Sequence, residues 1–145
     1  MSASLKIHGI LELKRELENL PAALKGQATA IVLDTAHAAA NDIRAQYPSG
    51  GTGNLRKGVK VVVKEIGPVG VAAQVRSGAP HAVLYEFGSE ARHYITKRGR
   101  WHATGRMPGR PVFIPTLMRY RRLMYRKLAA IIEAQGLKVK TDEAA

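Results

Sequence analysis

The chain has 145 residues, 46% of them hydrophobic and none of them cysteine. This length fits a single domain, and the lack of cysteine excludes disulfides, thiolate metal sites and a cysteine nucleophile. No stretch approaches the roughly 20 apolar residues of a membrane span, and the first residues lack the apolar run of a signal peptide. The sequence therefore predicts a soluble protein with no membrane partner.

The positive charge is concentrated in one part of the chain. The net charge is +12, from 23 Lys and Arg against 11 Asp and Glu. Residues 91–132 contain eleven Lys or Arg and no Asp or Glu, so this segment carries +11 and the remainder only +1. Charges of one sign at this density repel each other, and an anionic partner would relieve the repulsion.

The N-terminal third has helical periodicity. Apolar residues recur at steps of three and four from Ile10 to Leu20, and Pro21 can begin a second helix because a first-turn residue needs no amide donor. A narrow, alanine-rich stripe then runs to the turn at Pro48, formed by Leu24, Ala28, Val32, Ala36, Ala39, Ile43 and Tyr47. Small residues at these positions let a neighbouring element approach closely.

Two strands are predicted in the middle of the chain. Residues 59–64 and 71–76 alternate valine or alanine with mostly polar residues, and a Gly-Pro turn joins them, which is typical of an antiparallel pair. A turn-rich loop over 49–54 precedes the first strand. After the second strand, residues 81–87 favour one or two helical turns, which Gly88 would end.

A long basic segment follows, over residues 88–111. The residues 94–96 and 100–102 flank Lys97-Arg98-Gly99, a pattern that predicts a projecting hairpin with a basic tip. Residues 112–114 could form a short buried strand, and Pro115-Thr116 would begin a last helix with the apolar stripe Leu117, Tyr120, Met124, Leu128 and Ile131. We expect one domain over 1–137, with a basic arm at 89–111 inserted in it, and a polar tail at 138–145.

Catalytic patterns are weak in this sequence. No histidine pair has zinc-ligand spacing, and His93 and His102, which could face each other across the hairpin, are more simply read as solvated. Glu86 and Glu90 could form a carboxylate pair, although pairing of Glu86 with an arginine is favoured. The glycines of 50–54 lack the Lys-Ser/Thr of a phosphate-binding loop. We therefore predict no catalytic, cofactor-binding or metal-binding residues and no enzymatic activity.

Recognition of an anionic partner has more support. The basic segment interleaves Arg with aromatic residues, which suits phosphate contacts and stacking, but it carries no helix-turn-helix, zinc-finger or RNA-binding signature. On the last helix, steps of three and four align three arginines on one ridge, with Arg121 off it. The candidate contact residues are Arg92, Lys97, Arg98, Arg100, Trp101, Arg106, Arg110, Arg119, Arg122 and Arg126.

Four segments in a fixed order resemble a known family. They are Tyr47-Pro48 with Thr52 to Lys57, the valine-rich strands, His81 to Ser89, and Arg110 to Leu117. This arrangement resembles the gene-product-ten-like family of Hong Kong 97-type tailed phages, whose members are small virion proteins of the head–tail connection. The positions that carry the likeness are Gly53, Asn54, Leu55, Arg56, Tyr85, Glu86, Phe87, Gly88, Pro111, Phe113 and Pro115. The strongly basic loop with Trp101 departs from the usual pattern.

These motif residues make sense as a scaffold. We expect Gly53 and Asn54 to adopt the unusual backbone angles of a chain reversal, Leu55 to enter the core, and Arg56 to point outward. Phe87 and Phe113 are the only two phenylalanines, and we expect both in the core beneath the sheet.

We predict an α+β fold, with a long N-terminal helical region, a small antiparallel sheet and a C-terminal helix packed on it. The resemblance implies a homo-oligomeric ring in the neck of the particle, present in the host cytoplasm before assembly, whose neighbours are connector, head-completion, tail-terminator or tail-tube proteins. In such a ring, the alanine-rich stripe over 28–39 and any exposed valine edge would serve contacts between subunits. The basic arm would reach an acidic neighbour or the packaged double-stranded DNA. The alternative is a basic, non-specific nucleic-acid-binding protein.

Overall fold

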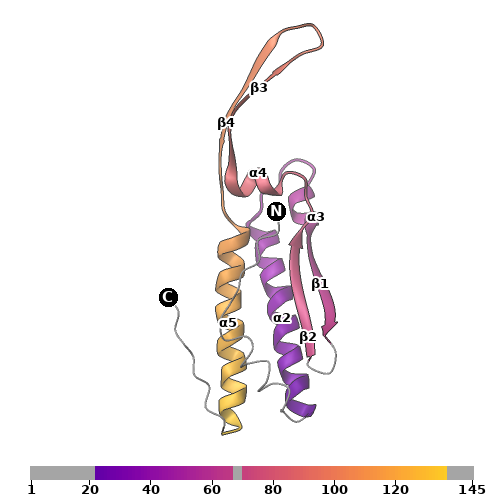
Figure 1. Cartoon of the computed structure of the whole chain (residues 1–145), viewed down its shortest axis with the longest axis vertical. Coiled ribbons are helices and arrows are strands. Elements are labelled where there is room, and N and C mark those ends of the chain that lie inside the picture. Colours follow the sequence, from indigo (N-terminus) through magenta and orange to yellow (C-terminus); the bar gives the residue numbers. More distant parts are fainter. Residues whose placement is uncertain (1–21, 67–69, 137–145) are drawn as a thin grey trace.

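The computed structural model describes residues 22–66 and 70–136. The elements follow in the order α2 (Ala22–Gln46), α3 (Asn54–Gly58), β1 (Val59–Ile66), β2 (Gly70–Ser77), α4 (Ala82–Phe87), β3 (Gly88–Ile95), β4 (Trp101–Pro108) and α5 (Phe113–Ala134). Figure 1 shows α2 and α5 side by side in opposite directions, the β1–β2 sheet along the other side of α2, and the β3–β4 hairpin projecting from one end. The predicted α+β fold is confirmed.

Helix α2 confirms the predicted second helix. Its apolar stripe turns toward the interior, with Leu24, Ala39 and Ile43 buried and Tyr47 buried directly after the helix. Ala39 is 2% exposed because α2 packs between α5 and the sheet. Ala39 therefore serves packing within the chain, whereas Ala28, Val32 and Ala36 are only partly buried. The helix predicted over 10–20 lies outside the described residues.

The loop after α2 holds a short helix that the sequence pattern did not predict. Gly53 has a φ of 65°, as expected for a chain reversal, whereas Asn54 already begins α3 with an ordinary negative φ. Leu55 packs against the core as predicted. Arg56 does not simply point outward, because its Nε donates a hydrogen bond of 2.8 Å to the carbonyl of Tyr47.

Strands β1 and β2 form the predicted antiparallel pair, in the register Val61 opposite Val75 and Val59 opposite Ser77. Val59 is buried, and Val61 and Val75 pack against the same cluster. That cluster contains Ala40, Ile43 and Tyr47 from α2 and its C-terminal end. Since side chains alternate between the two faces of a strand, one face of the sheet covers α2 and the other faces away from it.

The last helix begins earlier than predicted. Residues 112–114 are not a strand, because α5 begins at Phe113 and Val112 is its N-cap. Phe113 and Leu117 reach the same core cluster as the sheet valines, while Thr116, Leu128 and Ile132 are buried along α5. None of the helices in the described part of the chain combines the length and apolar character needed to cross a membrane.

Candidate functional site

The basic segment folds into a two-stranded arm. Strands β3 and β4 pair from Gly88 opposite Pro108 to Ile95 opposite Trp101, so the hairpin confirms the prediction and is longer than the pattern indicated. Its tip is closed by a hydrogen bond of 2.9 Å from the Thr96 amide to the Arg100 carbonyl. Figure 1 shows the arm extending beyond the body, and among the described elements its main contacts are with α4, at the base of the arm.

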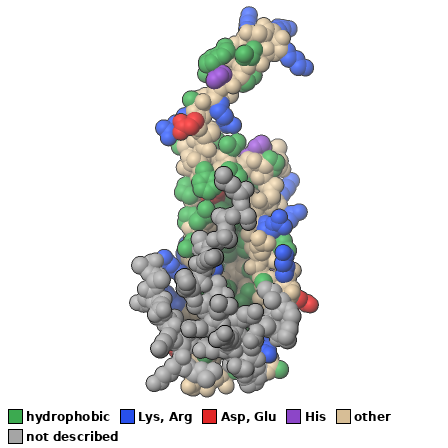
Figure 2. All heavy atoms as spheres, viewed as in Figure 1, with side chains coloured by type: hydrophobic (Ala, Val, Ile, Leu, Met, Phe, Trp, Pro, Cys, Tyr) green, Lys and Arg blue, Asp and Glu red, His purple; other side chains and the backbone are tan. Residues whose placement is uncertain are grey.

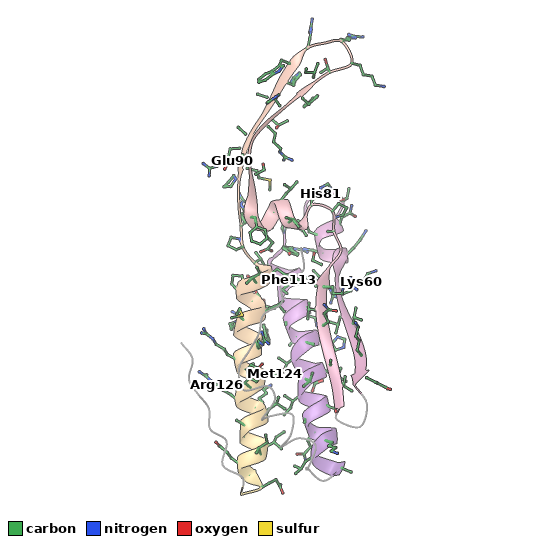
Figure 3. The ribbon with its side chains drawn as sticks, viewed as in Figure 1. Lys60, His81, Glu90, Phe113, Met124 and Arg126 are labelled. Carbon is green, nitrogen blue, oxygen red and sulfur yellow. The ribbon has the colours of Figure 1, made fainter. Side chains whose placement is uncertain are left out.

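Every candidate contact residue on the arm is exposed. The set comprises Arg92, Lys97, Arg98, Arg100, Trp101, Arg106 and Arg110. Figure 2 shows Lys and Arg at the tip and hydrophobic side chains directly behind them. The one acidic side chain on the arm, Glu90, lies at its base (Figure 3) and forms a 4.0 Å ion pair with Arg106 in which both side chains are largely in water. Such an exposed pair contributes little, so the arm remains basic.

Aromatic side chains occupy both faces of the arm. The His93 ring stacks on Trp101, with centroids 4.2 Å apart, and the Tyr94 ring stacks on His102, with centroids 5.6 Å apart. Tyr94 is directly opposite His102 in the register, whereas His93 is opposite Ala103. The two histidines are therefore on opposite faces, and the prediction that they could face each other is wrong. Trp101 is 65% exposed and Ile95 66%, an unusual amount of apolar surface for a ribbon without a partner.

A second group of predicted contact residues lies on α5, apart from the arm. Arg119, Arg122 and Arg126 form the predicted ridge and line one open groove with Met118 and Leu123. Arg126 projects from α5 away from α2 (Figure 3). Arg119 forms an ion pair with Asp42 of α2, so it also joins the two helices. Arg121 lies off the ridge and donates to the Tyr125 hydroxyl.

The arm is attached to the body through Glu86, which is 7% exposed. Its Oε1 accepts hydrogen bonds from the Tyr47 hydroxyl at 3.0 Å and the Phe113 amide at 2.9 Å, and its Oε2 accepts one from the Val112 amide at 2.8 Å. A carboxylate in this position satisfies free amides at the first turn of α5 and is favoured by the helix dipole. Glu86 thus joins α2, α4 and α5 at one point.

This arrangement corrects two predictions for Glu86. Among the described residues the carboxylate pairs with no arginine, and it does not form a pair with Glu90, which lies on the arm with its side chain 88% exposed. Burial, followed by the hydrogen bond to Glu86, raises the pKa of Tyr47 above its ordinary value of 10.0. Sequence periodicity could not reveal this site, because its three elements are far apart in the chain.

The remaining motif residues surround the same junction. The Tyr85 ring meets the Tyr47 ring edge-on at 5.5 Å, and the Tyr85 carbonyl accepts a 2.8 Å hydrogen bond from the Arg110 amide. Gly88 ends α4 with a φ of 75°, which glycine tolerates. Pro111 and Pro115 are exposed on either side of the start of α5.

The two phenylalanines have different environments. Phe113 packs against the core as predicted and lies at the upper end of α5 in Figure 3. Phe87 is 70% exposed, so its predicted place in the core is wrong. The reason is the helical position: Glu86 turns inward to the amides of α5, and the next side chain on the short helix α4 must point in another direction.

The described residues contain no group of three or more His, Asp or Glu that could hold a metal ion. A protein-family model described as "Bacteriophage HK97-gp10, putative tail-component" matches residues 12–88, just over half of the chain. The match ends where the arm begins. No curated protein and no solved structure matches the chain. The chain therefore belongs to the HK97-gp10-like family of bacteriophage tail components.

Proposed function

We propose that this protein is a structural component of the head–tail connection of a tailed phage, in the class of neck and tail-completion proteins. In this proposal, copies form a ring between the portal-side connector and the tail, around the path of the DNA. Membership of a tail-component family supports a structural role in the virion. The finer assignment depends on the arm.

The observation that carries the proposal is that the arm has the composition of an interface and extends away from the described body of the chain. Tyr, Trp and Arg are enriched at protein interfaces, and the arm exposes Tyr94, Trp101 and several arginines. Figure 1 shows the outer half of the arm extending away from the helices and the β1–β2 sheet, and among the described elements β3 and β4 have their main contacts with α4. An arm of this kind is stabilised when a neighbouring protein covers it.

The charge of the arm indicates the partner. Residues 89–111 contain six Lys or Arg and one acid, Glu90. A second copy of this chain, with a net charge of +12, would repel the arm. We therefore assign the arm to an acidic surface on a neighbouring connector or tail protein, while contacts between copies would use other surfaces. In a closed ring, each copy presents one patch to a different patch of the next.

The exposed Phe87 supports a contact near the arm base. It belongs to the family motif, yet it is 70% exposed beside Val83, which is 65% exposed. Large exposed apolar side chains of this kind mark interaction sites. A separate observation supports a non-catalytic role. Glu86, the buried carboxylate among the described residues, accepts three hydrogen bonds that hold the fold together.

The decisive experiment is charge reversal at the tip. Lys97→Glu, Arg98→Glu and Arg100→Glu would be introduced together into the gene in its phage, and purified particles examined by electron microscopy and assayed for retained DNA. We expect particles that fail to join heads to tails or that lose DNA. The control reverses Lys25, Lys57 and Lys127, which removes the same charge from the body. Normal particles from the tip variant would contradict the proposal.

The alternative, a free nucleic-acid-binding protein, is favoured by the overall charge of +12. It predicts that the protein is absent from purified particles and that the isolated protein binds duplex DNA tightly, with a steep loss of affinity as salt increases. Immunodetection of the protein in purified particles separates the two functions.

A further inference from the structure

The outer face of the β1–β2 sheet is basic. The alternation that turns Val61 and Val75 toward α2 turns the intervening residues to the opposite face. That face carries the cross-strand pairs Lys60 with Arg76, Val62 with Gln74, and Lys64 with Ala72. Figure 3 shows Lys60 projecting from β1 on the side away from α2, and Figure 2 shows Lys and Arg side chains gathered along this side of the molecule. We call Lys60, Lys64 and Arg76 the sheet cations.

The placement of these cations is unfavourable in the isolated chain. Lys60 and Arg76 are directly opposite each other across the ladder, where like charges destabilise a sheet. All three sheet cations are exposed, and none forms an ion pair within the described residues. The acid of β1, Glu65, is opposite Val71 and so belongs to the other face. A bound anion would remove the repulsion.

The chemistry of this face selects nucleic acid over an acidic protein. Two of the three sheet cations are lysines, a residue type depleted at protein interfaces. The three pairs named above contain no aromatic residue, and the largest apolar side chain among them is Val62, so they lack the aromatic anchors on which protein interfaces depend. Contacts with a phosphate backbone need only cations and polar groups, such as Gln74. The arm differs, because its cations are mostly arginines and it carries the aromatic residues Trp101 and Tyr94.

We propose that the outer sheet face, through Lys60, Lys64 and Arg76, binds the phosphate backbone of duplex DNA without sequence preference. This surface goes beyond the proposed function, in which the arm engages a neighbouring protein. The two surfaces lie on different elements, so either assignment can fail while the other holds.

The test measures binding of the full-length protein to a short, fluorescently labelled duplex of mixed sequence, by anisotropy over a range of NaCl concentrations. Each neutralised phosphate contributes roughly 0.9 to the slope of log affinity against log salt. The double variant Lys60→Gln/Lys64→Gln should therefore lower the slope by about 1.8 and weaken binding at low salt by about tenfold. Arg76→Gln should lower the slope by about 0.9.

The matched control is Lys25→Gln/Lys127→Gln, which removes the same two charges from α2 and α5. It should leave the slope close to that of the wild-type protein. Equal losses in the two double variants would show that net charge alone is responsible, and would overturn the proposal. So would an unchanged slope in the sheet variants, or displacement of the duplex by poly-glutamate as efficiently as by unlabelled duplex. Circular dichroism spectra matching the wild type would establish that each variant is folded.

Discussion

The Tyr47 hydroxyl donates a hydrogen bond to the carboxylate of Glu86, which also accepts hydrogen bonds from the amides of Val112 and Phe113 at the start of α5. The side chain of Tyr47 therefore helps to position the carboxylate that caps α5. If the Tyr47 hydroxyl is removed, the buried carboxylate of Glu86 loses one of its hydrogen-bond donors. Hydrogen bonds to charged groups contribute roughly 1.5–3 kcal/mol, and neutral ones about 1 kcal/mol. The loss of this single bond is therefore a measurable fraction of the total stability of a small domain.

We expect Tyr47→Phe to lower the free energy of unfolding by about 1–2 kcal/mol at neutral pH, measured by urea denaturation. The folded-state pKa of Tyr47 is raised, so its contribution is complete below the unfolded value of 10.0 and declines as the pH increases above it. The wild-type protein should lose up to about 1.4 kcal/mol per pH unit there through this group. Tyr47→Phe removes that component, since phenylalanine does not titrate. Parallel stability curves above pH 10 for the two proteins would contradict the assignment.

At the scale of elements, the junction between arm and body depends on close backbone approach. A Cβ atom on Gly109 would lie 2.7 Å from the carbonyl carbon of Phe87 and 2.8 Å from the carbonyl oxygen of Glu86. Both are backbone atoms, so a larger residue could be accommodated only by moving α4 away from the end of β4. The neighbouring hydrogen bond from the Arg110 amide to the Tyr85 carbonyl would then break.

Gly109→Ala should therefore loosen the arm base while leaving the body folded. We expect faster hydrogen exchange at the amides of Arg110 and Val112, with protection in α2 and α5 retained, measured by amide exchange mass spectrometry or NMR. Gly50→Ala is the control, because a Cβ there would meet nothing within 4 Å. Unchanged exchange at the arm base would show that the close approach does not hold the arm.

Elements with a local signal could be predicted from the sequence. The stripe of α2, the alternating valines and the basic turn at Lys97-Arg98-Gly99 each have their own periodicity or turn chemistry. The start of α5 at Phe113 and the exposure of Phe87 could not be predicted, because Glu86 determines both through contacts across 26 and 27 positions of the chain. The opposite faces of His93 and His102 depend on the register, where a shift of one residue reverses the face.

For the whole molecule, the arm and the body are structurally separable. The core cluster lies in the body, formed by Ala40, Ile43, Tyr47 and Val59, and it includes no residue of the arm. Every residue of β4 is exposed, and in β3 only Gly88 and Ser89 are partly covered. Since hydrophobic burial is the dominant stabilising contribution, the arm adds little to the stability of the body, and its cost in ordering is recovered only when a partner covers it.

This separation gives a direct test of what the arm is for. Replacement of residues 90–106 by Asn-Gly, a sequence suited to a tight hairpin turn, preserves the pair of Ser89 with Met107 and the junction at Glu86. The free energy of unfolding should change by less than about 1 kcal/mol, and the urea m-value should decrease only slightly, because m follows the surface exposed on unfolding. The same protein should fail to support assembly in the phage. Loss of cooperative unfolding in the shortened protein would mean that the arm is part of the folding unit. Normal assembly with the shortened protein would contradict the proposal that Trp101 and Tyr94 of the arm contact a neighbouring protein in the particle.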